Sequence, residues 1–204
     1  MNEKLSACPI CDNHEKNIFL DGQDYFLTQK KFDIVECSSC GFRFTNPRPT
    51  VESAETYYQT DDYISHGTQE SGIVPMLYGI ARHFALRSKF GIVKRYSPGK
   101  AILDIGCGTG EFLNYCQRKG LRCTGVEPSV KARKFAETTY RLDVKPDFLN
   151  GIDPSVRFDC ITLWHVLEHI HKLDETLKKL SRLLNKDGVL ILALPNSNSY
   201  DAQY

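Results

Sequence analysis

The sequence predicts an α/β fold with a doubly wound parallel sheet for residues 98–204. Short apolar runs alternate there with segments of helical periodicity, and strands that alternate with helices pair in parallel through right-handed crossovers. The first run, Ala101–Ile105, lies between Pro98-Gly99 and a group of glycines, which is typical of a strand buried on both faces. Ligands of such sheets bind beyond the carboxyl ends of the strands, so the residues that follow each strand are candidates for a site.

The other elements of this region are bounded by turn and capping residues. In order, we expect a helix over Glu111–Lys119, a strand over Leu121–Val126, a helix over Ser129–Tyr140, strands near 143–148 and over Phe158–Trp164, a helix that Asp174 caps and Asn185–Gly188 ends, and a strand over Gly188–Leu194.

Residues 50–97 are predicted to form a helical linker or cap region. Thr45–Pro49 is stiffened by two prolines, and Thr50 is a suitable N-cap for a short helix over 53–58. Ile73–Tyr96 has apolar residues at helical spacing and is followed by Ser97-Pro98-Gly99. We expect this long helix to precede the first strand and to cover the sheet.

Residues 1–49 contain two C-x-x-C pairs, Cys8-Pro-Ile-Cys11 and Cys37-Ser-Ser-Cys40. Four thiolates in this arrangement suit a tetrahedral zinc ion, whereas a redox C-x-x-C needs a thioredoxin-like βαβ context that is absent here. The other four cysteines are scattered, which favours a reduced, cytoplasmic protein with one metal site over a disulfide framework. We interpret residues 1–49 as a zinc-ribbon-like module that takes much of its folding free energy from the metal.

Between the cysteine pairs the sequence predicts strands, with Asp21-Gly22 as a turn between the first two. The strand-like runs are Ile18–Leu20, Tyr25–Leu27 and Phe32–Val35. Two roles remain open for such a module: a structural unit that packs on the next domain or helps to hold substrate, and contact with nucleic acid. Its mixed charge favours the first.

The composition of the whole chain is that of an ordinary globular protein. Its 204 residues suffice for one full domain and a small module, and 41% hydrophobic and 25% charged residues are ordinary globular usage. A net charge of +1 without long runs of one sign disfavours electrostatic binding of nucleic acid. No stretch approaches the ~18 consecutive apolar residues of a membrane span. We therefore expect neither nucleic acid nor a membrane as partner.

The segment Asp104-Ile-Gly-Cys-Gly-Thr-Gly110 follows the first strand. Glycines permit positive φ and close approach of the backbone to a ligand, and the helix expected from Glu111 would present free N–H groups to anionic groups. A dinucleotide fingerprint places its third glycine one residue later, and a P-loop requires Gly-Lys-Ser/Thr. The loop therefore indicates a nucleotide-type site of another class.

Acidic and aromatic residues follow the next strands at the same predicted edge. Glu127 ends the second strand, about 20 residues after the glycines, where a carboxylate can accept hydrogen bonds from both hydroxyls of a ribose. Asp147 lies near the end of the third strand, and Trp164 ends the fourth. The glycine loop and the residues after the next three strands are thus all expected at one edge of the sheet, and this expectation does not depend on any single motif.

Five motifs can now be taken together: Asp104–Gly110, Gly125-Val-Glu-Pro128, Phe158-Asp159, Trp164-His-Val-Leu-Glu-His-Ile170 and Leu194-Pro-Asn196. They resemble the class I S-adenosylmethionine (SAM)-dependent methyltransferases. The chain is most similar to a branch that joins an N-terminal four-cysteine zinc module to a methyltransferase domain, and relatives in that branch often modify sugars or other small metabolites. The resemblance implies a Rossmann-like sheet, SAM as cofactor, structural zinc, and O- or C-methylation of a small-molecule acceptor.

The resemblance also implies roles for individual residues. In the family, Asp104 would lie near the amino group of the methionine part of SAM, Glu127 would hold the ribose, and Asp147 would meet the adenine amino group. Trp164 would lie near the cofactor. The methionine part would be cradled by the backbone of the glycine loop, at Gly106, Cys107, Gly108 and Gly110.

His169 is the candidate catalytic base, with Glu168 as its orienting or metal-holding partner. Methyl transfer requires mainly alignment and desolvation, but an oxygen nucleophile also needs a group to accept its proton. Imidazole titrates near neutrality, which suits that task; the alternative is that both residues only fix their loop. His165 is expected to be packed or near the cofactor. His165-x-x-Glu168-His169 also matches the zinc-protease string H-x-x-E-H, which requires a helix and a distant third ligand. Here the string follows a buried strand of a nucleotide-type fold, so we reject a zinc protease.

The family's sheet has seven strands, and little sequence follows Asn196. Residues 98–204 are therefore predicted to be a C-terminally incomplete methyltransferase domain that lacks the last two strands. Two other functions remain open: an RNA methyltransferase whose zinc ribbon recognises the substrate, and a non-catalytic SAM-binding module. The sequence predicts neither the acceptor nor the oligomeric state.

Overall fold

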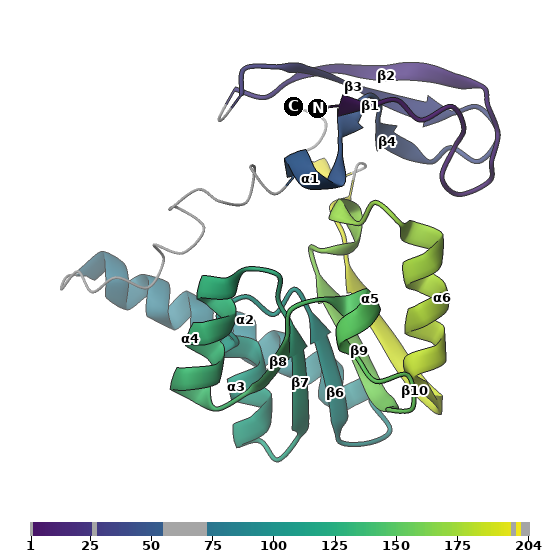
Figure 1. Ribbon diagram of the computed structural model, residues 1–204. Coiled ribbons are helices and arrows are strands. Elements are labelled where there is room, and N and C mark those ends of the chain that lie inside the picture. Colours follow the sequence, from purple (N-terminus) through teal and green to yellow (C-terminus); the bar gives the residue numbers. More distant parts are fainter. Residues whose placement is uncertain (1, 26–27, 55–72, 197–198, 201–204) are drawn as a thin grey trace. The chain divides into compact units, whose positions relative to one another are not determined.

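The structure, a computed structural model, describes residues 2–25, 28–54, 73–196 and 199–200 (Figure 1). The chain divides into two compact units, Met1–Thr68 and Gln69–Tyr204. No helix within the described ranges is long and apolar enough to cross a membrane.

The short helix α1, Val51–Ala54, begins after Thr50, whose Oγ1 accepts a hydrogen bond from the N–H of Ser53 at 3.4 Å. The rest of the predicted helix over 53–58 lies outside the described residues.

The first unit is built from short antiparallel strands. A sheet of order β2-β3-β4 contains Lys16–Gln23, Lys31–Cys37 and Arg43–Thr45, and a second pair joins β1, Asn2–Glu3, to β5, Arg48–Pro49. Asn46 connects the beginning and end of the unit: its amide Nδ2 donates to the carbonyl of Leu5 at 3.1 Å, and its Oδ1 accepts from the N–H of Leu5 at 2.8 Å.

The predicted turn at Asp21-Gly22 is wrong. Strand β2 runs through both residues, which pair with Asp33 and Phe32 of β3. The chain reverses after Gln23 instead, where Asp24 Oδ2 accepts hydrogen bonds from the N–H and the hydroxyl of Thr28 at 2.7 and 2.6 Å. Cross-strand pairing thus overrides the local turn signal. Tyr25 belongs to this reversal, and the remainder of the run Tyr25–Leu27 lies outside the described residues.

The second unit contains the predicted doubly wound sheet. Five parallel strands lie in the order β10-β9-β6-β7-β8 (Figure 1). The chain proceeds from β6 to β8 on one side and from β9 to β10 on the other, so the direction of winding switches between β6 and β9, where ligands of such sheets bind. The strands are β6 Ala101–Ile105, β7 Arg122–Val126, β8 Asp143–Lys145, β9 Phe158–Trp164 and β10 Leu184–Ala193.

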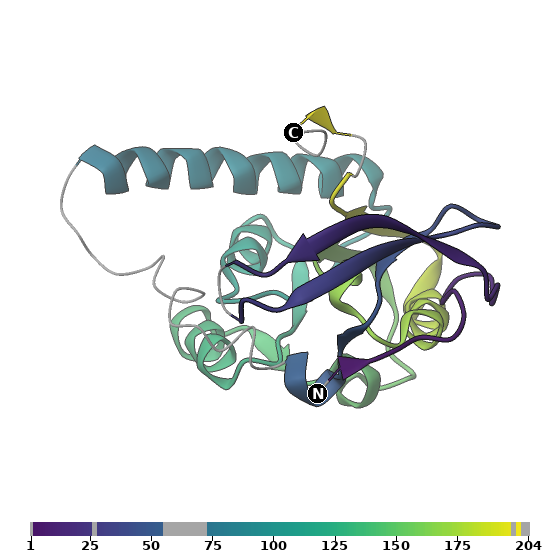
Figure 2. The same ribbon diagram turned by 90° about the horizontal axis from the view of Figure 1, so that it is seen from above.

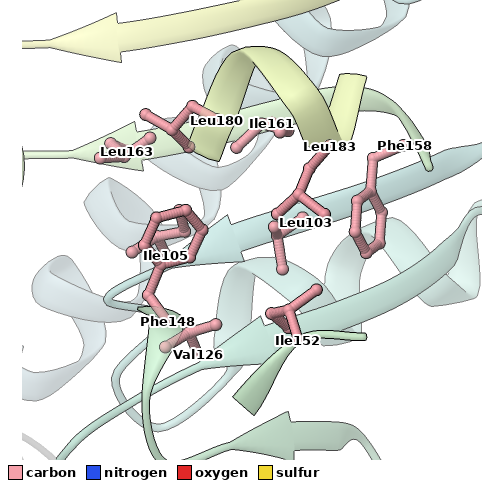
Figure 3. Close-up of a cluster of buried hydrophobic side chains, with 10 residues drawn as sticks. All are labelled: Leu103, Ile105, Val126, Phe148, Ile152, Phe158, Ile161, Leu163, Leu180 and Leu183. Carbon is pink, nitrogen blue, oxygen red and sulfur yellow. The ribbon is translucent and has the colours of Figure 1, made fainter. Parts of the chain in front are cut away.

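Helices cover both faces of this sheet, and the long predicted helix is present as α2, Ile73–Tyr96. Figure 2 shows α2 along one side of the unit, with its first turns extending past the other elements. One core layer combines residues of α2, α3 and α4 with the sheet, and the other combines residues of α5 and α6 with the opposite face (Figure 3). The remaining helices are α3 Glu111–Arg118, α4 Val130–Tyr140, α5 Phe148–Gly151, the 3₁₀ turn η4 Leu167–His169 and α6 Leu173–Leu183.

Alternation along the strands decides which side chains reach the site. Leu103 of β6 and Ile161 of β9 point into the layer drawn in Figure 3, whereas Ile102 and Cys160 point to the face that carries α2 and α3. Since successive side chains of a strand face opposite sides, Asp104 belongs to the α2 face.

Two boundary predictions near the last strand are wrong. The N-cap position of α6 is Lys172, and Asp174 instead lies in the first turn, where its carboxylate accepts from Lys178 at 2.6 Å. Strand β10 begins at Leu184 and includes Asn185–Gly188 with a register shift before Val189. Asn185 Nδ2 donates to Asp159 Oδ1 at 2.6 Å, so a tertiary hydrogen bond holds extended backbone at a segment whose composition favours a turn.

Candidate functional site

The glycine loop is tied to two neighbouring elements. The N–H groups of Gly106 and Cys107 both donate to the carbonyl of Val126, at 2.8 and 3.0 Å, which joins the loop to the end of β7. The N–H of Asn114 donates to the carbonyl of Gly110 at 2.8 Å, so α3 begins directly at the loop. The free N–H groups of the first turn of α3 therefore lie beside the loop, as expected for an anion-binding helix start.

Gly108 and Gly110 both have positive φ, 55° and 79°, but their surroundings differ. A Cβ atom at Gly110 would lie 2.6 Å from Leu142 Cδ1 and 2.9 Å from Ala136 Cβ, so this glycine allows close packing of the loop on the core. A Cβ atom at Gly108 would meet nothing within 4 Å. The backbone at Gly108 therefore faces open space, which a ligand can approach closely.

Asp104 lies near the carboxyl end of β6, and its side chain is buried. Only 2% of the residue is exposed, and Oδ1 accepts a hydrogen bond from the hydroxyl of Thr162 on β9 at 2.6 Å. Burial raises the pKa of Asp104 to about 7, although the Thr162 hydroxyl and the positive charge of Lys89 lower it. A cationic group of a ligand would stabilise the ionised form in the same way.

Glu127, at the end of β7, is also buried, with 4% exposed. Its Oε2 accepts from the N–H of Gly108 and its Oε1 from the N–H of Ser129, both at 2.9 Å. The predicted ribose acid and the glycine loop therefore form one hydrogen-bonded unit. Each carboxylate oxygen has a further lone pair that can accept from a hydroxyl group.

Asp147 lies just beyond β8 and is exposed. Its Oδ2 accepts from Asn150, from the backbone N–H at 3.2 Å and from the side-chain amide at 2.8 Å, so it starts the short helix α5. Its place after β8 agrees with the sequence pattern. Its contact with adenine stays a prediction.

Trp164 ends β9, and its ring packs edge-on against Phe112 of α3 with centroids 5.6 Å apart. Its Nε1 is buried and has no hydrogen-bond partner among the described residues. Lys89 of α2 places its ammonium group over both rings, 4.8 Å from the centroid of Trp164 and 6.0 Å from that of Phe112. Such geometry is typical of a cation–π contact.

Sequence reasoning missed Lys89. The signal for it is its place on α2: Leu86, Lys89 and Val93 follow one another at helical spacing, and Val93 is buried. A half-buried lysine can lay its stem along apolar neighbours, and Lys89 brings its charge over two aromatic rings.

The segment after β9 brings His165 and Glu168 together. His165 Nδ1 lies 3.6 Å from Glu168 Oε1, and 64% of the histidine side chain is exposed. His165 is therefore not packed, and the alternative that it lies near the cofactor stays a prediction. The backbone of His165 has φ 57°, and its N–H donates to the carbonyl of Ala193 at 3.0 Å. His169 ends the adjacent turn η4. The proton-transfer role of Glu168 and His169 stays a prediction.

The four predicted metal ligands lie together in the first unit. The sulfur atoms of Cys8, Cys11, Cys37 and Cys40 are all within 4.8 Å of one another, with 3.7 Å between Cys8 and Cys40 and 3.6 Å between Cys11 and Cys37. A tetrahedral zinc ion with Zn–S bonds of ~2.3 Å separates its ligands by about 3.8 Å. The cluster therefore has the dimensions of a tetrahedral thiolate site.

Both cysteine pairs end in the same backbone conformation. Asp12 and Gly41, which follow the second cysteine of each pair, have φ 60° and 70°. In the second pair, N–H groups of Cys40 and Ser39 point toward the sulfur of Cys37 and lower its pKa to about 6. Backbone N–H groups directed at sulfur favour the thiolate, which is the form that binds a metal.

Fold and site together define a protein that binds a nucleotide-type cofactor at the carboxyl edge of a doubly wound sheet. The chain belongs to the methyltransferase-domain family, whose model matches residues 81–204. The class I SAM-dependent methyltransferases, which the five motifs resemble, are therefore the class to which it is assigned, and the sheet order agrees with that assignment.

Curated relatives support the same family. A ubiquinone biosynthesis O-methyltransferase of Bradyrhizobium diazoefficiens is 30% identical over 133 residues, which cover 62% of this chain and 53% of the relative. An enzyme of the same name from Actinobacillus pleuropneumoniae is 34% identical over 109 residues, 48% of this chain and 47% of the relative. The chain thus spans about half the length of the curated relatives it matches.

Solved structures show the fold alone. The StiE O-methyltransferase domain superposes with a TM-score of 0.51 at 19% identity and covers 60% of this chain and 47% of that one. A sugar N-methyltransferase from Streptoalloteichus has a TM-score of 0.50 at 24% identity, covering 65% and 57%.

Proposed function

We propose that this chain binds SAM and transfers its methyl group to a small-molecule acceptor, at oxygen or carbon, with a sugar or related metabolite as the acceptor class. The observation that carries the proposal is the set of buried Asp104, the open backbone at Gly108 and buried Glu127. They offer an acceptor for the ammonium, open backbone for the methionine part and an acceptor for the ribose. The relatives named as O-methyltransferases support oxygen as the acceptor atom.

In this proposal the chain's own residues bind and orient the cofactor. Asp104 receives the ammonium of the methionine part, and the backbone of Gly106, Cys107, Gly108 and Gly110 cradles it. Glu127 receives the ribose hydroxyls, Asp147 the adenine amino group, and Trp164 borders the cofactor. Bound SAM supplies a sulfonium methyl group that needs no further activation, so alignment and exclusion of water are the main tasks of the protein.

Proton removal from an acceptor hydroxyl is assigned to the segment after β9. His169 is the proposed base and Glu168 its orienting partner. Because Glu168 also contacts His165, the imidazole of His165 is a second candidate for the base. Once an acceptor is identified, His169→Gln and His165→Gln should be compared in pH–rate profiles. The base is the histidine whose loss removes the rise of rate with pH; a rise that survives both changes would exclude this segment as the base.

The four-cysteine cluster is proposed to hold one structural zinc ion. The dimensions of the cluster and the N–H groups directed at Cys37 support this assignment. The ion would complete the fold of the first unit, because four neighbouring thiolates repel one another without a cation.

A calorimetric titration tests the cofactor assignment. The zinc-loaded chain should bind S-adenosylhomocysteine (SAH), the product form of the cofactor, and Asp104→Asn should weaken binding about tenfold or more, because it removes a charged hydrogen-bond acceptor. Asp143→Asn, at an exposed carboxylate on the edge strand β8, is the matched control and should bind as the original chain does. A folded chain that binds neither SAM nor SAH would refute the proposal.

A further inference from the structure

We propose that a cavity at the amino ends of the sheet strands binds a small organic anion, a ligand that joins an apolar body to one anionic group. The site is separate from the proposed cofactor site, and the inference does not rest on the proposed function. It rests on the cavity, on the two lysines that line it, and on the charges of the chain around it.

The cavity lies between the last turns of α2 and α3. Its volume is about 300 Å³, and three apolar residues line it together with two lysines: Phe90, Val93, Leu121, Lys94 and Lys119. This volume is at the lower end of the range of small-molecule sites and suits a ligand of one or two rings.

The cavity is at the end of the sheet opposite to the glycine loop. Gly99, which also lines it, precedes β6 by two positions, and Leu121 directly precedes β7. The glycine loop and Glu127 instead follow the carboxyl ends of these strands. Because the five residues of β6 span roughly 15 Å, the length of the strands separates the two sites.

Positive charge gathers in the segments that line the cavity. Residues 73–103 and 112–126 contain no aspartate or glutamate. The ends of these segments nearest the lining residues carry six cations, and none of the six makes an ion pair with a described residue: Lys94, Arg95, Lys100, Arg118, Lys119 and Arg122. An anion is the ligand that complements this charge.

Apolar surface lies beside this charge. The ring of Phe90 packs edge-on against Tyr115 of α3, with centroids 5.5 Å apart, and Lys119 Nζ lies 5.7 Å from the centroid of Tyr115. The stem and ammonium of Lys119 thus border the aromatic side of the cavity. An inorganic anion would use the lysines alone, so the combination of charge and apolar lining favours an organic anion.

One objection is the partial negative charge at the carboxyl ends of α2 and α3. At both ends the chain's own N–H groups already bind carbonyls: Ser97 donates to Val93 at 2.8 Å, and Lys119 donates to Cys116 at 3.0 Å. Cations in the last turn also stabilise a helix, so Lys94 and Lys119 have a structural role in addition. Each helix end amounts to about half a negative charge, which the six cations outweigh.

A second objection is the carboxylate of Asp159, which lies against Gly99. Its Oδ2 accepts from the N–H of Ala101 at 2.9 Å, and its Oδ1 accepts from the amide of Asn185 at 2.6 Å. The hydrogen bond from Ala101, with smaller effects of Asn185 and the charge of Arg122, lowers the pKa of Asp159. The chain itself therefore balances this carboxylate, and the two lysines of the cavity remain for a ligand.

The test compares 1-naphthoate with 1-naphthamide, which has nearly the same shape without the charge. The anion should bind at least tenfold more tightly by calorimetry, and salt at about 1 M should weaken it through screening. Methyl NMR gives the place of binding: signals of Val93 and Leu121 should shift, whereas that of Leu163, in the opposite core layer, should not. Parallel titration with 1-naphthyl phosphate distinguishes a phosphate from a carboxylate as the preferred anionic group.

Replacing both lysines isolates the role of their charge. Lys94→Met/Lys119→Met keeps the aliphatic stems, so it should weaken 1-naphthoate at least tenfold and leave 1-naphthamide and SAH unaffected. Lys131→Met/Lys134→Met, at two exposed lysines of α4, is the matched control and should bind 1-naphthoate as the original chain does. Thermal unfolding verifies that both variants fold. The comparison of anion and amide in the original chain needs no variant.

Several results would overturn the inference. They are equal affinities of the anion and the amide, methyl shifts away from Val93 and Leu121, and tight binding of 1-naphthoate after both lysines are replaced. Displacement of SAH by 1-naphthoate would place the ligand at the cofactor edge and would also overturn it. So would lysine-dependent binding of single-stranded RNA by a chain that binds neither naphthyl anion. SAH binding is measured separately, so failure of the proposed function gives a different result from failure of this inference.

Discussion

The carboxylate of Glu127 accepts a hydrogen bond from the backbone N–H of Gly108 at 2.9 Å. The acid at the end of β7 thereby holds the middle of the glycine loop, which follows the neighbouring strand β6. Its other oxygen accepts from the N–H of Ser129, the N-cap residue of α4, so the same side chain also contacts the start of that helix. Glu127 thus positions the loop in addition to any contact with a ribose.

Replacing Glu127 should therefore affect both stability and cofactor affinity. In Glu127→Gln one of the two acceptor oxygens becomes an N–H donor that faces another donor. We expect a loss of about 1–3 kcal/mol in the free energy of unfolding and at least tenfold weaker SAH binding. Denaturant unfolding and calorimetry measure the two effects. Glu137→Gln, at an exposed position of α4, is the control and should alter neither.

Asp104 should make the stability of the ligand-free protein depend on pH. Its pKa is raised from 3.8 to about 7 in the folded state, so the folded chain binds one more proton than the unfolded chain between these values. The stabilisation is complete below pH ~4 and is lost as pH rises to 7, by about 1.4 kcal/mol for each unit of pKa shift.

Asp104→Asn isolates this effect, because the amide cannot titrate and its oxygen can still accept from Thr162. The variant should be more stable than the original chain at pH 8, and the difference should shrink as pH falls toward 4. Thermal unfolding across this pH range measures it. A constant difference would mean that Asp104 does not titrate in this window.

The sequence predicted elements whose signals are local. Helix α2 has the predicted bounds because its apolar spacing stops at Ser97-Pro98-Gly99, and β6 has the predicted bounds because proline and glycines flank it. The site residues at the strand ends followed from topology, since parallel strands bring their carboxyl ends to one edge.

What the sequence missed depends on contacts between distant segments. The hydrogen bond between Glu127 and Gly108 requires the actual loop backbone, and the place of Lys89 requires the docking of α2 on α3. Asp21-Gly22 has turn composition, but its partners on β3 keep it extended. Local propensity is a weak prior wherever a neighbouring strand offers hydrogen bonds.

Zinc binding should depend on the four cysteines of the cluster and on no other cysteine of the chain. The purified chain should contain one zinc ion, measured by elemental analysis, and Cys37→Ser should abolish it together with the thermal transition of the first unit. Cys123→Ser, in β7 and outside the cluster, should keep the zinc. Retention of zinc by the Cys37→Ser variant, or its loss in Cys123→Ser, would contradict the assignment.

Two glycines of the loop, Gly108 and Gly110, should respond differently to substitution by alanine. Gly110→Ala places a methyl group against Leu142 and Ala136 in the core, so it should lower the free energy of unfolding by several kcal/mol through overpacking and backbone strain. Gly108→Ala meets open space and should cost only about 1–2 kcal/mol for its positive φ. Its methyl group, however, occupies the side from which a ligand approaches the backbone, so SAH binding should weaken far more than stability does. Measuring both quantities for both variants decides the matter: if Gly108→Ala bound SAH normally, the open space beside Gly108 would not be the cofactor site.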